Sequence, residues 1–86
     1  MSGALRFLPE VEEDLIAGYR WYQEKAPGIG EDFLRSFYDR AHWIHRHPMH
    51  CPQVYRGFRR CLLRRFPYAV YFRMEDNEVV VFGVFH

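Results

Sequence analysis

The C-terminal segment from Arg59 to His86 constrains the fold most, because strand-like stretches follow one another there with almost no chain between them. These stretches are rich in β-branched and aromatic residues, and they span Phe58–Phe66, Tyr68–Met74 and Val79–Phe85. Only the polar sequence EDNE, residues 75–78, separates the last two, and its composition is typical of a hairpin turn. Connections this short join antiparallel neighbours, so we expect a three-stranded antiparallel meander.

The N-terminal half predicts a short strand followed by two helices. Ala4–Phe7 is apolar enough for the strand, and Pro9 can begin a helix because its missing N–H is not needed there. Helical spacing then continues to about Lys25, and after the break APGIG it resumes and ends near Arg46. The apolar positions at this spacing are Val11, Leu15, Tyr19 and Tyr22 in the first helix and Phe33, Phe37, Ala41 and Ile44 in the second.

We therefore expect an α+β fold: an N-terminal strand, an antiparallel helical hairpin and the three-stranded meander. Residues 47–57, with two prolines and a glycine, are expected to form a loop. The hairpin should pack on one face of the sheet and leave the other face free to bind a partner. At 86 residues we expect one domain, residues 1–86.

A net charge of +1 conceals a marked separation of charge along the chain. Residues 1–39 carry eight acids and four bases, residues 40–73 carry eight arginines and no acid, and the remainder carries three acids. A basic segment of this kind can attract phosphate or an acidic protein, and the alternative is a face that only water covers. Arginine favours planar, bidentate contacts to carboxylate or phosphate.

Compartment and cofactor are constrained by what the sequence lacks. Cys51 and Cys61 are the two cysteines and have no CxxC spacing, so we expect reduced thiols. No signal peptide or membrane span is expected, and we predict a cytoplasmic protein that does not bind membranes. His42, His45, His47, His50 and Cys51 cluster in sequence, but without a carboxylate nearby we interpret them as polar residues around a helix end. We expect no metal and no cofactor.

Several motifs together resemble the RelE/ParE superfamily of bacterial toxins, which belong to type II toxin–antitoxin systems and are often called plasmid stabilisation proteins. The matching segments are RFLPEVEEDL, WYQEKAPGIGEDFL, the HP that follows the second helix, and RRCLLRRFPYAVYFRMEDNEVVVFGVFH. The resemblance implies a small toxin that a cognate antitoxin, ParD-like or other, holds inactive. RelE-like members cleave messenger RNA on the ribosome, whereas ParE-like members poison DNA gyrase.

The resemblance favours the ParE-like branch. The sheet position that carries a catalytic arginine in the nuclease branch falls on Ala69, and an alanine can neither transfer a proton nor stabilise charge. A tail arginine and tyrosine of that branch would follow His86. We therefore expect no catalytic residue, lean against an enzyme, and do not expect direct nucleic-acid binding. The alternatives are a ribosome-dependent nuclease with a rearranged site of Arg64, Arg65, Tyr68 and Arg73, or a non-toxic remnant that only binds antitoxin.

The candidate binding residues are the arginines that precede and enter the predicted strands, together with one tyrosine and the final histidine. We predict that these residues bind the antitoxin or the target: Arg56, Arg59, Arg60, Arg64, Arg65, Tyr68, Arg73 and His86. Neighbouring arginines on a strand should point to opposite faces, so the alternative is that only some of them are free to bind. For Tyr68, the alternative to a binding role is that its ring packs in the sheet.

Overall fold

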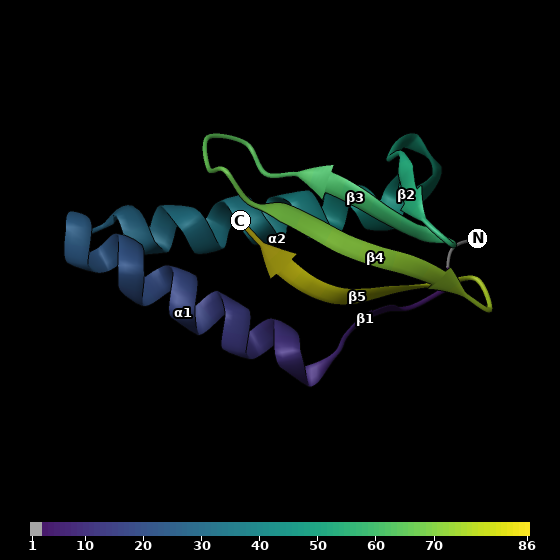
Figure 1. Cartoon of the computed structure of the whole chain (residues 1–86), viewed down its shortest axis with the longest axis horizontal. Coiled ribbons are helices and arrows are strands. Elements are labelled where there is room, and N and C mark those ends of the chain that lie inside the picture. Colours follow the sequence, from purple (N-terminus) through teal and green to yellow (C-terminus); the bar gives the residue numbers. More distant parts are fainter. Residues whose placement is uncertain (1–2) are drawn as a thin grey trace.

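Two helices lie against one face of a five-stranded sheet in the computed structural model, which describes residues 3–86 (Figure 1). The predicted α+β fold and the order of its elements are confirmed. The elements are β1 (Leu5–Phe7), α1 (Pro9–Lys25), α2 (Ile29–Arg46), a 3-10 turn η1 (Pro48–His50), β2 (Gln53–Tyr55), β3 (Phe58–Leu62), β4 (Ala69–Glu75) and β5 (Glu78–Phe85).

The sheet is mixed, with the strand order β1-β5-β4-β3-β2. The pairings β2–β3, β3–β4 and β4–β5 are antiparallel, whereas β1 pairs with β5 in parallel, with Arg6 opposite Val80. The meander is thus extended at both edges, by β2 and by β1. The two-helix crossover from β1 allows this parallel pairing, because parallel neighbours need a connection of a dozen or more residues.

Strand β2 lies within residues 47–57, where the sequence predicted only a loop. The missed signal is the pair Arg56 and Gly57, whose φ angles are 38° and 87°. Two consecutive residues with positive φ are what a two-residue hairpin turn of the I′ type requires, and glycine at the second position is typical of it. The β2–β3 hairpin is therefore specified by a turn that carries arginine where asparagine or aspartate is usual.

Strand β3 ends at Leu62, earlier than the predicted end at Phe66. Leu63 and Phe66 are buried in the core, and the two arginines between them are exposed. Arg65 has a φ of 73°, which strand geometry does not allow. The apolar residues at this point anchor a loop instead of continuing a strand.

The core lies between the helical hairpin and the sheet. Phe33, Phe37 and Phe72 are fully buried at its centre, with aliphatic residues from α1, β4 and β5 around them. Helices α1 and α2 approach closely at Gly18, where an added Cβ would lie 2.6 Å from Cε2 of Phe33. A glycine at this position lets the ring of Phe33 fill the space between the helices.

A side chain from α1 holds the junction between the two helices. Oε1 of Gln23 accepts hydrogen bonds from the backbone N–H groups of Gly28 and Gly30, at 3.2 and 3.0 Å. These donors at the start of α2 have no partner within that helix. The APGIG break is therefore a helix junction that α1 itself caps.

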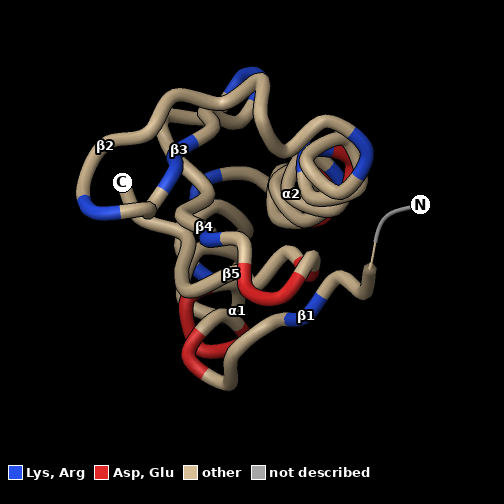
Figure 2. The backbone as a smooth tube through the Cα atoms, turned by 90° about the vertical axis from the view of Figure 1, so that its right-hand side faces the viewer, with Lys and Arg blue, Asp and Glu red and all other residues tan. Residues whose placement is uncertain are grey.

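Charged residues are separated in space as well as in sequence (Figure 2). Acidic residues gather along α1 and at the β4–β5 turn, whereas arginines occupy β3, the β2–β3 turn and parts of α2. The basic segment of the sequence therefore covers the sheet edge around β3 and the adjoining side of α2. Within residues 3–86, no helix is long and apolar enough to cross a membrane.

Candidate functional site

Helices α1 and α2 cover one face of the sheet (Figure 1), and we call the opposite face, which carries Phe58, Arg60, Tyr71, Arg73 and Phe82, the open face. Alternation places Arg60 of β3 and its partner Tyr71 of β4 on this face. The guanidinium group of Arg73 lies 5.2 Å from the ring of Phe58 and 5.6 Å from that of Phe82. Of the predicted site residues, the structure thus brings Arg60 and Arg73 together here.

Arg59 points to the other side of the sheet from Arg60, as strand alternation predicts. Its Nη1 donates a 2.6 Å hydrogen bond to the backbone oxygen of Cys51. This bond ties the segment before β2 to β3, so Arg59 has a structural role at this edge of the sheet. Arg56 lies at the tip of the β2–β3 turn, with its guanidinium group 5.4 Å from the ring of Tyr55.

Tyr68 forms part of the aromatic packing between the sheet and the helices, and the exposed His86 lies against its ring. The half-buried ring of Tyr68 lies 4.9 Å from Phe33, 6.0 Å from Tyr22 and 5.4 Å from His86, measured between ring centroids. Burial and the nearby Tyr68 raise the pKa of the Tyr22 hydroxyl. These ring contacts agree with the alternative interpretation of Tyr68, in which its side chain packs within the fold.

Arg64 and Arg65 lie on a third surface, where the β3–β4 loop faces α2. They line a cleft together with residues of α2, and the hydroxyl of Ser36 donates a 2.8 Å hydrogen bond to the backbone oxygen of Arg64. The eight predicted residues thus fall on separate surfaces. Arg64, Arg65, Tyr68 and Arg73, which a rearranged nuclease site would require together, do not converge.

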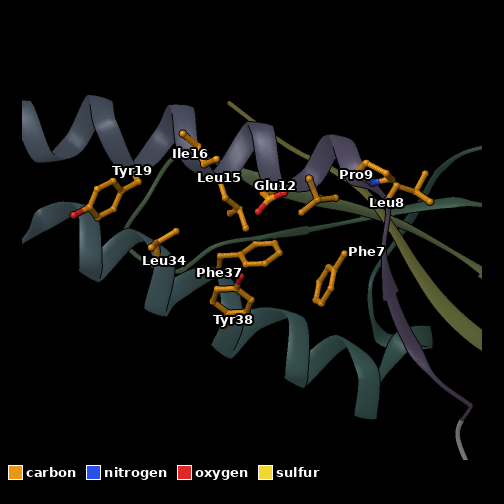
Figure 3. A pocket seen from close by; sticks show the side chains of 11 residues that line it. Phe7, Leu8, Pro9, Glu12, Leu15, Ile16, Tyr19, Leu34, Phe37 and Tyr38 are labelled. Carbon is orange, nitrogen blue, oxygen red and sulfur yellow. The ribbon is translucent and has the colours of Figure 1, made fainter.

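Sequence reasoning missed an apolar groove of about 460 Å³ between α1 and α2, next to β1 (Figure 3). The rings of Phe7, Phe37 and Tyr38 lie side by side in it, with centroids 5.0 to 6.4 Å apart. Phe7, Ile16 and Tyr38 keep 41 to 46% of their surface exposed. The available signal was the width of the apolar stripe on each helix, since Ile16, Leu34 and Tyr38 lie next to residues assigned to the core.

Polar groups border this groove. The Tyr19 hydroxyl donates a 2.9 Å hydrogen bond to Oε2 of Glu31, which joins α1 to α2 and raises the pKa of Tyr19. Glu12 lines the groove from α1. The groove is therefore apolar along its length and carries a carboxylate at its wall.

Three histidines at the end of α2 and in the following turn, His45, His47 and His50, contact other groups of the fold. His47 stacks on His50 with ring centroids 5.2 Å apart, and both rings lie next to Trp43. His45 Nε2 is 2.7 Å from the backbone oxygen of Gly3. Among residues 3–86, no three His, Cys, Asp or Glu side chains are grouped as a metal site would require.

Comparison with known proteins gives a family match over almost the whole chain and solved structures of similar fold. Residues 5–86 match the family described as ParE toxin of type II toxin-antitoxin system, parDE. A chain in a structure of the chromosomal ParDE TA system from P. aeruginosa superimposes with a TM-score of 0.87. The alignment covers 96% of this chain and 94% of that chain at 18% sequence identity, which demonstrates a shared fold. Comparison with curated protein sequences finds no match.

Proposed function

The chain belongs to the ParE toxin family of type II toxin–antitoxin systems, and from this we propose that it is a toxin that binds DNA gyrase and is neutralised by a cognate antitoxin. The observation that carries the proposal is the extent of the family match. Residues 5–86 include every strand and both long helices, so the match covers the whole described fold from β1 onward. Gyrase as target and neutralisation by an antitoxin go beyond the family assignment and are the proposed part.

The groove between α1 and α2 supports an antitoxin partner. Phe7, Ile16 and Tyr38 expose apolar surface along a hollow flanked by two helices, which suits the apolar face of an amphipathic helix. Glu12 in the wall would favour a lysine or arginine at the edge of that face. A segment that folds as it binds could bury the groove without a large pre-formed surface of its own.

The open face supports binding to a second protein. Phe58, Phe82 and Phe85 provide aromatic area there, and Arg60 and Arg73 lie among them. Aromatic residues and arginines are the side chains that most often dominate the affinity of protein–protein interfaces. We assign the target to this face and the antitoxin helix to the groove.

The placement of the basic residues favours binding over RNA cleavage. A nuclease site needs a proton acceptor, a proton donor and cations around one phosphate. Ala69 is buried, Tyr68 packs among aromatic rings, and Arg73 lies on the open face beside Glu75. These positions give no single point where the required groups could act together.

The test is supercoiling by purified gyrase with increasing amounts of the protein, alone and after mixing with the antitoxin encoded beside it. We expect inhibition that the antitoxin reverses. A variant with Arg60→Glu should inhibit less because it places a negative charge on the open face, whereas Arg20→Glu on α1 changes the charge equally and should inhibit normally.

Full supercoiling at every concentration would reject gyrase as the target. Growth of cells that express the protein without antitoxin then separates the remaining possibilities. Normal growth would favour a non-toxic protein that only binds antitoxin, and arrested growth with RNA cleavage on ribosomes would favour the nuclease alternative.

A further inference from the structure

A cleft of about 460 Å³ separates α2 from the β3–β4 loop, and arginines dominate its lining. Three of them belong to α2 and two to the loop, and none of the three on α2 was among the predicted site residues. The charged lining residues are Arg35, Arg40, Arg46, Arg64 and Arg65, with Asp32 and Asp39. Five positive charges against two negative charges leave a strong excess of positive charge around one hollow.

The loop arginines are held in place by the fold. Leu63 and Phe66 are buried on either side of Arg64 and Arg65, and the Leu63 N–H donates a 2.8 Å hydrogen bond to the Tyr68 oxygen. The bond from the Ser36 hydroxyl to the Arg64 oxygen fixes the loop against α2. Both arginines are therefore presented to the cleft by a loop anchored at three points.

The two aspartates leave most of the arginines unpaired. Asp32 contacts Arg35 at 2.9 Å and Arg65 at 3.8 Å, so one carboxylate serves two guanidinium groups. In the part of the chain that the structure describes, Arg40, Arg46 and Arg64 form no ion pair. Three cations thus face the cleft without a carboxylate.

Arg40 provides a second, independent observation. Its guanidinium group lies 5.2 Å from the Trp43 ring, and its buried Nε has no hydrogen-bond acceptor among residues 3–86. A buried donor without an acceptor is rare, because the group has lost water and gained nothing in return. Because this Nε is out of reach of water in the structure, an oxygen of a ligand in the cleft could accept from it only after the Arg40 side chain turns toward the cleft.

We propose that this cleft binds a phosphate group. A carboxylate has two oxygens in one plane and one negative charge, and a single pair of arginines satisfies it. A terminal phosphate carries up to two charges and three oxygens that point in different directions, and a nucleic-acid backbone carries one charge at each successive phosphate. Both suit cations approaching from a helix on one side and a loop on the other. The proposal does not rest on the toxin function, and the cleft shares no residue with the apolar groove.

The test uses Trp43 as an internal probe. Trp21 is the other tryptophan, lies outside the cleft and is replaced by phenylalanine so that fluorescence reports on Trp43 alone. This protein is titrated with inorganic pyrophosphate, with a single-stranded oligonucleotide and with a glutamate peptide of the same net charge as pyrophosphate. We expect saturable changes with the phosphate compounds.

Matched variants separate the cleft from general charge effects. Arg46→Gln with Arg64→Gln removes two exposed cleft arginines and should weaken pyrophosphate binding about 10- to 100-fold, since two charge-assisted hydrogen bonds are lost. Arg20→Gln with Arg56→Gln removes the same charge elsewhere and should weaken it less than about 2-fold. Circular dichroism should show both variants folded.

Each outcome bears on the proposal. Pyrophosphate binding as tight as oligonucleotide binding assigns the cleft to small phosphate compounds, and much tighter oligonucleotide binding assigns it to a nucleic-acid backbone. Absence of saturation with every phosphate compound overturns the proposal. Equal losses in the two double variants, or equal binding of the glutamate peptide, overturn it as well.

Discussion

Helix α2 separates two hollows of equal volume and opposite chemistry. The groove toward α1 and the cleft toward the β3–β4 loop each enclose about 460 Å³. The groove uses Leu34, Phe37 and Tyr38 of the helix. The cleft uses residues one or two positions from these and continues to Trp43 and Arg46. At 3.6 residues per turn these two sets lie on opposite sides of α2. One helix thus serves two surfaces because its apolar and basic residues differ in phase.

The comparison shows what kind of partner each side can hold. Binding in the groove depends on apolar area removed from water, which salt barely affects. Binding in the cleft depends on charge at a partly exposed site, which salt screens within about 10 Å at 0.1 M. Salt dependence is therefore the property that distinguishes the two sides.

The largest effect should come from placing charge in the groove. Replacing Ile16 and Tyr38 together by aspartate should weaken antitoxin binding by about 100-fold or more, because unpaired charges would be buried in the interface. Both side chains are about half exposed in the free protein, so folding should be little affected. Calorimetric titration with antitoxin measures the loss, which should be the same at low and high salt.

Met49→Asp is the matched control for Ile16→Asp alone, because each adds one charge and Met49 is an exposed apolar residue outside the groove. It should bind antitoxin like the wild type. If the variant at Ile16 and Tyr38 bound antitoxin as tightly as the wild type, the groove would not be part of the antitoxin interface.

The second effect concerns the close packing of α1 on α2, the two helices that flank the groove. Gly18→Ala should destabilise the protein by about 1–3 kcal/mol, because the new methyl group would meet the ring of Phe33. This loss should exceed the gain of about 1 kcal/mol that alanine brings to a helix interior. Urea unfolding measures the difference. In a Phe33→Leu background the same change should cost less, and an equal cost there would show that the ring is not the cause.

The groove and the cleft also differ in how far the sequence predicted them. Helix α1 was predicted with its observed bounds, because Pro9 and the spacing of Val11, Leu15, Tyr19 and Tyr22 are local signals. The groove forms only because β1 places Phe7 next to the helices. The cleft forms only because the β3–β4 loop places Arg64 next to Ser36, which is 28 positions away in the sequence. Such contacts between distant segments leave no periodic signal in the sequence.

The predicted set of arginines shows the same limit. The basic segment was visible as a count of charges, but alternation and the loop divide it between the open face, the cleft and the structural bond of Arg59. The I′ turn at Arg56 and Gly57 was missed for another reason, since arginine is unusual where φ is positive. The residue type alone therefore identified the arginines, but it could not predict on which surface each of them lies.

The third effect is smaller and depends on salt. An antitoxin whose helix lies in the groove would need a further acidic segment to reach the arginines of the open face and the cleft. With such a segment, replacing Arg59, Arg60, Arg64 and Arg65 by alanine should weaken antitoxin binding about 10-fold and make it less salt-dependent, because favourable long-range charge interactions with that segment are lost. Arg59 also holds the Cys51 oxygen, so the sharper variant keeps it and replaces the other three. Affinity measured across salt concentrations checks this. Unchanged affinity at every salt concentration would exclude these arginines from the interface.

The smallest effect near neutral pH is a loss of stability that begins only at alkaline pH, where the buried thiol of Cys51 titrates. Burial, followed by a hydrogen bond with Cys61, raises the pKa of the Cys51 thiol from 9.0 to about 12, and the charges of Arg40 and Arg59 oppose the shift. The folded protein therefore holds this proton more tightly than the unfolded chain does. The contribution to stability is complete below pH 9 and is lost as the pH rises toward 12.

We expect the free energy of unfolding to fall over this range more steeply for the wild type than for Cys51→Ala. The gap between the two proteins should be constant from pH 6 to 8 and should narrow above pH 9. A gap that stays constant throughout would show that the Cys51 thiol titrates alike in the folded and unfolded states.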